Sequence, residues 1–172
     1  MVARVSDDEC CRYLIDAFAG VFPNLQLKGG AEEPFYVAPT SDMCAIIYFR
    51  SNFPRSLLHE VAHYCLAGDR RRTLDDFGFW YSPCGRTAEE QVSFEIVEAR
   101  PQGLEMAMCE IVGLKFSPSL DDFSGRPPSA YFLQNLDAAY REMLTNPPLT
   151  AANALNGLKK YRDAHGALIE FR

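Results

Sequence analysis

One apolar segment in the first half of the chain carries a polar interruption that limits how it can fold. Residues 57–66 read Leu-Leu-His-Glu-Val-Ala-His-Tyr-Cys-Leu, and their apolar positions recur at the spacing of a buried helix face. His59 and His63 stand four residues apart, which places both imidazoles on one side of that helix. An unpartnered polar stripe inside a core is costly, and a metal ion bound by both rings would remove that cost.

The segment 59–63 matches the HExxH pattern, in which two histidines bind a metal ion and the glutamate between them acts on a metal-bound water. The chain has 3 histidines, and two of them fall in this pattern. We therefore predict a metal site with Glu60 as a catalytic residue. Two unrelated histidines on a helix surface are the alternative, because so short a pattern also occurs by chance. The third histidine, His165, lies in a polar stretch, and we expect it at the surface.

A third ligand has to come from another part of the chain, because two histidines alone do not bind a metal tightly. The next predicted helix begins at Thr87 and contains several glutamates. Those of its first turn serve to cap the helix and to interact with its dipole. We take the third ligand from those further along, in the order of preference Glu98, Glu95 and Glu105. The predicted metal ligands are thus His59, His63 and Glu98.

Two histidines and one carboxylate with open positions suit catalytic zinc and non-haem iron(II) alike. HExxH with a distant glutamate is the pattern of zinc-dependent metallopeptidases, in which Glu60 would be the general base toward a peptide carbonyl. A binding module with a structural metal is a third interpretation. Structural sites usually have four protein ligands, however, and Cys65 is expected to point away from the metal face. The ligand residues alone do not separate the two metals.

The rest of the sequence predicts an α+β fold, a small β-sheet packed against several helices, in a single compact domain spanning residues 1–172. Two strand-like segments, 35–38 and 43–49, flank a Pro-Thr-Ser-Asp turn and predict a hairpin. Proline and paired glycines make the segment 23–33 a predicted loop. Helical spacing predicts helices over 6–21, 52–68 with Pro54 in the first turn, 87–113 with a kink or a new start at Pro101, 129–146 and 150–164.

The composition argues against several kinds of partner. The formal net charge is −6, so we expect no direct contact with nucleic acid. No apolar run approaches the length of a membrane span, and we see no signal peptide, so we expect no membrane. The 6 cysteines show no paired spacing and no disulfide framework. We interpret them as reduced thiols, which predicts a cytoplasmic protein.

The sequence after the HExxH segment is more specific than that motif. Residues 59–68 continue into Arg-Arg-Thr-Leu-Asp-Asp-Phe-Gly-Phe-Trp-Tyr at 71–81, and later come Gly85-Arg86, Phe94-Glu95-Ile96-Val97-Glu98 and Pro101-Gln102. This series strongly resembles the bacterial elongation factor P hydroxylase family. The aromatic loop and the Pro-Gln step are not part of peptidase patterns, so the resemblance favours a hydroxylase.

The resemblance implies hydroxylation of the β-lysylated lysine of translation elongation factor P, which would be the protein substrate. It also implies a mononuclear non-haem metal, expected to be Fe(II), held by His59, His63 and Glu98, with dioxygen as the co-substrate. The expected chemistry agrees with this metal, because hydroxylating an unactivated C–H bond needs a redox metal with open positions. Zinc has no accessible redox change and would not serve.

A long cationic side chain would suit an acidic mouth lined by aromatic rings. The segment that follows the metal helix offers such residues, and we predict that they bind the substrate: Asp75, Asp76, Trp80 and Tyr81. A structural loop with capping aspartates and a small aromatic cluster is an equally weighted alternative.

Overall fold

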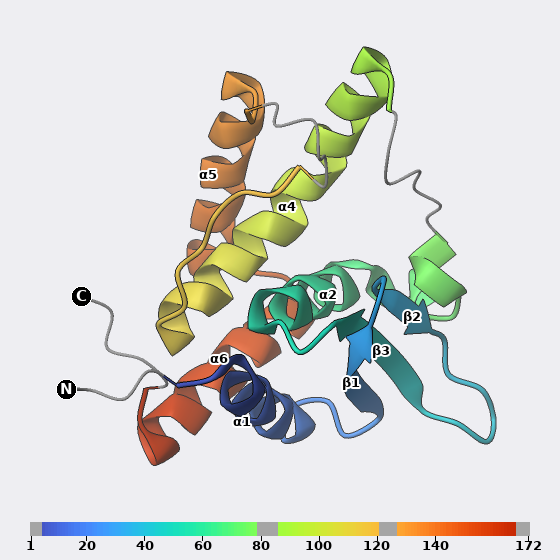
Figure 1. Cartoon of the computed structure of the whole chain (residues 1–172), viewed down its shortest axis with the longest axis vertical. Coiled ribbons are helices and arrows are strands. Elements are labelled where there is room, and N and C mark those ends of the chain that lie inside the picture. The colour runs from blue at the N-terminus through green and yellow to red at the C-terminus, as the bar shows by residue number, and fades with distance from the viewer. Residues whose placement is uncertain (1–4, 79–85, 121–126, 168–172) are drawn as a thin grey trace.

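The helix that carries the HExxH segment lies at the centre of the fold (Figure 1). The structure is a computed structural model that describes residues 5–78, 86–120 and 127–167. The central helix, α2 (Pro54–Leu66), packs against α1, α4, α6 and strand β3. Its apolar residues Leu57, Leu58, Val61 and Ala62 are fully buried, so most of its surface is covered by other elements.

The sheet has three strands in the order β1-β3-β2. β2 (Phe35–Val37) pairs antiparallel with β3 (Ala45–Arg50), which confirms the predicted hairpin. β1 (Leu25–Ala31) pairs parallel with β3 at the other edge of β3. A small sheet against several helices is the predicted α+β fold, and the structure confirms it.

The prediction of a loop over 23–33 is wrong, because most of it forms strand β1. Its two glycines, Gly29 and Gly30, were the reason for predicting a loop, but both lie in β1, an edge strand with irregular pairing. The register shifts between Lys28 and Ala31, and Gly30 has a φ of 88°, which a side chain would disfavour. A Cβ at Gly29 would lie 2.8 Å from the carbonyl oxygen of Ser51, so glycine permits a close approach of two backbones here.

Two of the helices begin at capping boxes. Ser6 and Glu9 form a capping box at the start of α1 (Asp7–Ala19), and Thr87 and Glu90 form one at the start of α4. α4 runs as one helix of 25 residues from Ala88 to Val112, so no new helix starts at Pro101. The remaining helical elements are α3 (Gly68–Arg71), the 3-10 turn η1 (Asp75–Gly78), α5 (Ala130–Thr145) and α6 (Leu149–His165).

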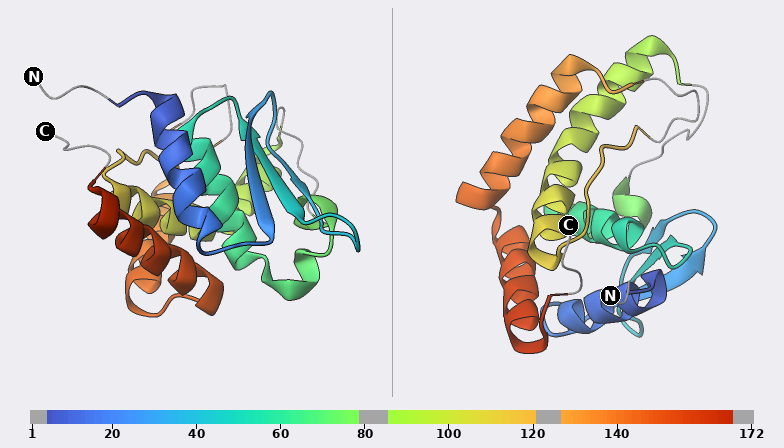
Figure 2. Two further views of the ribbon diagram at one scale, coloured as in Figure 1. Left: turned by 90° about the horizontal axis from the view of Figure 1, so that it is seen from below. Right: turned by 60° about the vertical axis from the view of Figure 1, so that its left-hand side comes forward.

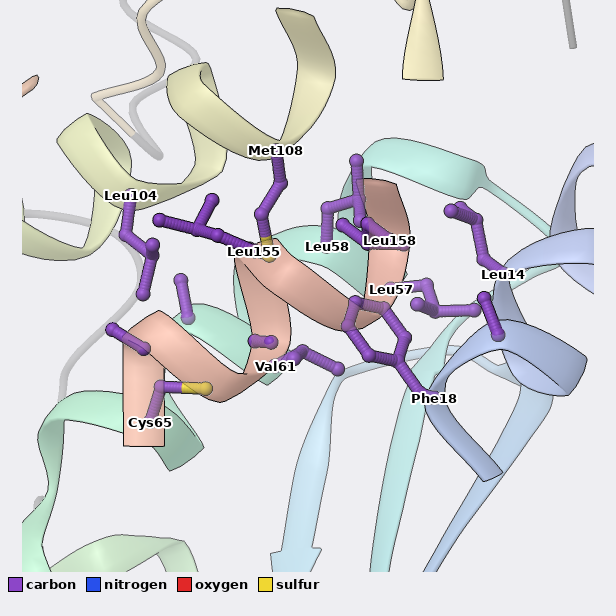
Figure 3. Packing of buried hydrophobic residues seen from close by; sticks show 14 of the residues in the cluster. Leu14, Phe18, Leu57, Leu58, Val61, Cys65, Leu104, Met108, Leu155 and Leu158 are labelled. Atoms are coloured by element: carbon purple, nitrogen blue, oxygen red, sulfur yellow. The ribbon is translucent and has the colours of Figure 1, made fainter. Parts of the chain in front are cut away.

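The main apolar core forms where four helices meet, as Figure 3 shows. α1 contributes Leu14 and Phe18, and α2 contributes Leu57, Leu58 and Val61. Leu104 and Met108 enter from α4, and Leu155 and Leu158 enter from α6. This core covers one side of α2 and leaves its histidine side to face another part of α4.

α4 and α5 lie side by side and extend away from the sheet, as both Figure 1 and the right-hand view of Figure 2 show. Five cysteines fall in the described part of the chain, and all five are free thiols, whereas Cys84 lies outside the described residues. None of the helices among the described residues combines the length and the apolar character that crossing a membrane requires.

Candidate metal centre

The two histidines of the HExxH segment direct the same ring atom toward a shared point. Nε2 of His59 lies 3.0 Å from Nε2 of His63, and the ring planes are 80° apart. This follows from the helix itself, since residues four apart project from one face of α2. Both side chains are partly exposed, at 24% for His59 and 15% for His63, so the shared point can be reached from solvent.

Glu98 brings a carboxylate to the same point from α4. Its Oε2 lies 3.3 Å from Nε2 of His59, and its Oε1 lies 3.3 Å from Nε2 of His63. Glu98 is 3% exposed, so its charge is held away from water. Each of the three residues offers one ligand atom, and these three atoms all lie within 4.8 Å of one another. They are therefore close enough to bind one metal ion.

The spacing of these atoms fits a first-row metal ion. Donors about 2.1 Å from a metal and about 90–110° apart at it are separated by about 3.0–3.4 Å. The 3.0 Å and 3.3 Å separations among His59, His63 and Glu98 fall in this range. Two imidazoles and a carboxylate are also the donor types that iron(II) and catalytic zinc accept. The residues therefore fit a mononuclear metal ion of this kind.

The electrostatics of the cluster favour a cation at this point. Burial opposes ionisation of Glu98, but the neighbouring His63 and His59 outweigh burial and hold the pKa of its carboxyl well below the ordinary value. Burial also opposes a proton on His59, but hydrogen bonds to Glu105 and Glu98 outweigh it and raise the pKa of the ring well above the ordinary value. The metal-free cluster thus attracts a proton where a metal cation would otherwise sit.

The two other glutamates considered for the third ligand are occupied elsewhere. Glu95 accepts a hydrogen bond from the hydroxyl of Ser129, at the start of α5. Glu105 accepts hydrogen bonds from Arg55 and lies 3.0 Å from Nδ1 of His59, the ring nitrogen that faces away from the cluster. Of the three candidates, the structure brings Glu98 to both Nε2 atoms.

The comparison with known families decides the relationship. The family model described as Elongation factor P hydroxylase matches residues 16–165. The chain belongs to this family. The match includes all of the segments on which the sequence resemblance was based, from the HExxH helix to the Pro-Gln step of α4.

A curated relative supports the same assignment. The protein named Elongation factor P lysine hydroxylase from Haemophilus influenzae is 43% identical over 106 residues. That match covers 60% of this chain and 59% of the relative, so the chain spans about three fifths of the curated protein it matches.

The metal cluster opens into a cavity of about 540 Å³. His59, Glu60, His63 and Glu98 line one part of it, and Asp76 lines another. Burial raises the pKa of Glu60, so this carboxyl holds a proton more readily than an exposed glutamate does.

The predicted substrate-binding residues divide into two groups. Asp75 accepts a hydrogen bond from the backbone N–H of Ala38 at 2.9 Å, and Asp76 accepts one from the N–H of Tyr36 at 2.8 Å. Both aspartates therefore cap backbone N–H groups, as the alternative interpretation of a structural loop expected. Asp76 also lines the cavity. Trp80 and Tyr81 lie outside the described residues.

The turn that carries these aspartates is conformationally strained. Asp76 and Phe77 have φ values of 46° and 54°, in the left-handed region that side chains disfavour. Phe77 is buried, and its ring stacks on Tyr36 at a centroid distance of 4.2 Å. The two carboxylate hydrogen bonds and this stacking hold the strained turn against β2, beside the cavity.

Two residues around the cluster, Arg55 and Gln102, were not predicted from the sequence. A third, Glu105, was considered only as a metal ligand and not as a partner of His59. A signal for two of them was present in α4. Its buried polar residues follow one another in steps of four, three, four and three, which forms one stripe along the helix. This polar stripe is also the full set of buried polar side chains in the described part of the chain: Gln91, Glu95, Glu98, Gln102 and Glu105.

Proposed function

We propose that this protein hydroxylates the β-lysylated lysine of elongation factor P, with iron(II) held by His59, His63 and Glu98. The observation that carries the proposal is the convergence of both Nε2 atoms and the Glu98 carboxylate at one accessible point, in a chain that belongs to the elongation factor P hydroxylase family. The name of the Haemophilus influenzae relative supports a lysine as the target.

Bound iron would supply the accessible redox change and the open positions for dioxygen that an unactivated C–H bond requires. The chain's own residues would bind the metal, orient the substrate and hold a proton. His59 and His63 come from the rigid central helix, and Glu98 from a helix packed against it, so the three ligands are preorganised. Glu60 lies on the cavity wall, where its carboxyl is the group that we propose holds and releases a proton during turnover.

The substrate side chain is long and cationic, and the cavity offers it carboxylates. We propose that Asp76 receives an ammonium group through the oxygen that does not bind the N–H of Tyr36. Asp75 would contribute mainly by holding the same turn against Ala38, and Trp80 and Tyr81 would line the aliphatic part of the substrate. Because elongation factor P acts in translation, we propose a cytoplasmic location, which agrees with the free thiols.

The direct test is intact-mass measurement of β-lysylated elongation factor P after incubation with the iron-loaded protein, dioxygen and ascorbate. Dioxygen, two electrons from ascorbate and two protons yield one oxygen atom in the product and one water. We expect a mass gain of one oxygen atom on the β-lysylated substrate, with no gain when zinc replaces iron.

Two comparisons make this test specific. His59→Ala should abolish the mass gain, and His165→Ala, which changes the exposed third histidine, should leave it intact. Equal oxygen incorporation with zinc, or cleavage of the substrate chain in place of oxygen incorporation, would contradict the proposal. Cleavage that requires zinc would instead indicate the metallopeptidase alternative.

A further inference from the structure

Glu105 connects the predicted metal cluster to a fixed cation. Its Oε2 lies 3.0 Å from Nδ1 of His59, and its Oε1 accepts hydrogen bonds from Nε and a terminal nitrogen of Arg55 at 3.0 and 2.8 Å. The Glu105 side chain is buried, with 2% of its surface exposed, so water competes little with either interaction. Each carboxylate oxygen therefore has its own donor, one from His59 and one from Arg55.

This arrangement determines which nitrogen of His59 carries the proton. Oε1 of Glu105 already accepts from Arg55, and the facing oxygen Oε2 is the acceptor that suits an N–H at Nδ1, so this geometry favours the tautomer with the proton on Nδ1. In the neutral ring, Nε2, which faces His63 and Glu98, then has the lone pair that a metal needs. The contact with Glu105 also restricts rotation of the ring, since turning it would break the 3.0 Å contact.

Arg55 holds the carboxylate in its position. It lies one helical turn before His59 on α2, so the two residues project from the same face of that helix. Its guanidinium also donates to the carbonyl oxygen of Ser117 at 2.6 Å and lies 5.2 Å from the centroid of the Phe116 ring. These contacts hold the guanidinium in place, and the guanidinium in turn holds the buried carboxylate of Glu105 beside His59.

We propose that Glu105, held by Arg55, is a positioning residue that fixes His59 in the orientation and tautomer needed to bind the metal. The inference rests on the metal site of the proposed function and adds a residue pair outside the three ligands. Partners of this kind commonly change metal affinity about 10- to 100-fold when they are removed.

Glu105→Gln is the sharpest variant, because an amide has the shape of the carboxylate and only one acceptor oxygen. Whichever way it turns, its NH₂ group meets either Arg55 or Nδ1 of His59. Glu95→Gln is the matched control, since Glu95 is also a buried glutamate of α4 with a hydrogen bond to Ser129. Glu95 does not line the cavity.

The experiment measures the dissociation constant of cobalt(II) by competition with a chelator, together with the thermal unfolding temperature of each metal-free protein. We expect Glu105→Gln to weaken cobalt binding about 10- to 100-fold. Glu95→Gln should bind cobalt within about twofold of the unchanged protein. The visible absorption of bound cobalt(II), which reports on ligand geometry, should change in Glu105→Gln and stay the same in the control.

A double-mutant cycle tests whether Arg55 acts through Glu105. Arg55→Gln alone should weaken cobalt binding, and adding it to Glu105→Gln should weaken binding no further. Cobalt binding by Glu105→Gln at unchanged affinity and with an unchanged spectrum would overturn the proposal, whatever happens to its unfolding temperature. Failure of the unchanged protein to bind cobalt would instead remove the metal site itself, so the two failures are distinguishable.

Discussion

The two sides of α4 have opposite chemistry, although both are buried. The side facing α2 carries the polar stripe, including Glu98, Gln102 and Glu105. The closest contact with α5, which we call the α5 seam, is made by the small residues Ala99 and Gly103. At Gly103 a Cβ would lie 2.8 Å from the backbone nitrogen of Tyr140, so the two helices approach as closely as their backbones allow.

The difference separates stability from function within one helix. Small and apolar residues in the α5 seam gain free energy from close packing. The polar stripe gains none in this way, since each buried carboxylate must be paired to offset its desolvation. Each glutamate of the polar stripe has a partner. Glu95 pairs with Ser129, Glu98 with the two histidines, and Glu105 with Arg55 and His59.

The largest expected effect lies on the polar stripe and on the histidines that face it. His59→Ala, His63→Ala or Glu98→Ala should each weaken metal binding by more than about 100-fold, beyond the loss caused by removing an outer partner. Metal content after gel filtration measures this, with His165→Ala as the control. A Glu98→Ala variant that kept metal as tightly as the unchanged protein would break the comparison, because the stripe would then not be a ligand-bearing surface.

The next largest effect is expected in the α5 seam, where a substitution should reduce stability and leave metal binding unchanged. Gly103→Val should lower the free energy of unfolding by about 3 kcal/mol, since the new side chain collides with α5. Denaturant unfolding of the metal-free protein measures this, with Ser93→Val at an exposed position of α4 as the control. The folded fraction should bind metal normally. A loss of metal affinity without a loss of stability would contradict the separation of the two sides.

Gln102 tests whether every member of the polar stripe serves the metal. Its side chain donates to the carbonyl oxygen of Ser119 at 2.7 Å and accepts from the N–H of Ser119 at 3.0 Å, and its amide nitrogen lies 3.4 Å from Glu98. Gln102→Leu should lower the free energy of unfolding by about 1–3 kcal/mol, because both hydrogen bonds between the Gln102 side chain and the backbone of Ser119 are lost. Metal affinity should fall far less than in Glu98→Ala. An equal fall in both variants would make Gln102 part of the metal site.

A smaller effect is expected in the pH dependence of the metal-free protein. The pKa of His59 is raised above its ordinary value of 6.5, so its stabilising contribution is fully present below pH 6.5 and is lost as the pH rises through the raised pKa. The pKa of Glu98 is lowered below 4.5, so its contribution is present above pH 4.5 and is lost as the pH falls through the lowered pKa.

Urea unfolding of the metal-free protein between pH 4 and pH 9 measures this dependence. Stability should decline above pH 6.5, and the decline should be weaker in Glu98→Gln, which removes one of the charges that holds the proton on His59. A decline of equal size in both proteins would show that another group is responsible.

The grouping of His59, His63 and Glu98 could be predicted in part from the sequence, because helix geometry is local. HExxH determines which ring atoms share a face of α2, and α4 supplied a short set of glutamates from which Glu98 was preferred. The choice between Glu95, Glu98 and Glu105 depends on how α4 crosses α2 and α5, which no spacing within one helix contains. The regular steps of the polar stripe would have shown that all three face one side, although not which partner each one meets.

The missed strand β1 has a different cause. Gly29 and Gly30 are ordinarily loop residues, and their presence in a strand depends on the close backbone of Ser51. Asp75 was predicted to bind substrate because its charge suits a cationic side chain, and no sequence pattern indicated its hydrogen bond from Ala38, a residue 37 positions earlier in the chain. In both cases a contact between distant segments decides the outcome, and local sequence patterns do not report it.

The proposed function requires one iron ion bound jointly by α2 and α4. Anomalous diffraction at the iron absorption edge, from crystals of the iron-loaded protein, tests it most directly. We predict a single strong peak within bonding distance of Nε2 of His59, Nε2 of His63 and a carboxylate oxygen of Glu98. A peak located elsewhere, or no peak between these three side chains in a protein that retains iron, would contradict the claim.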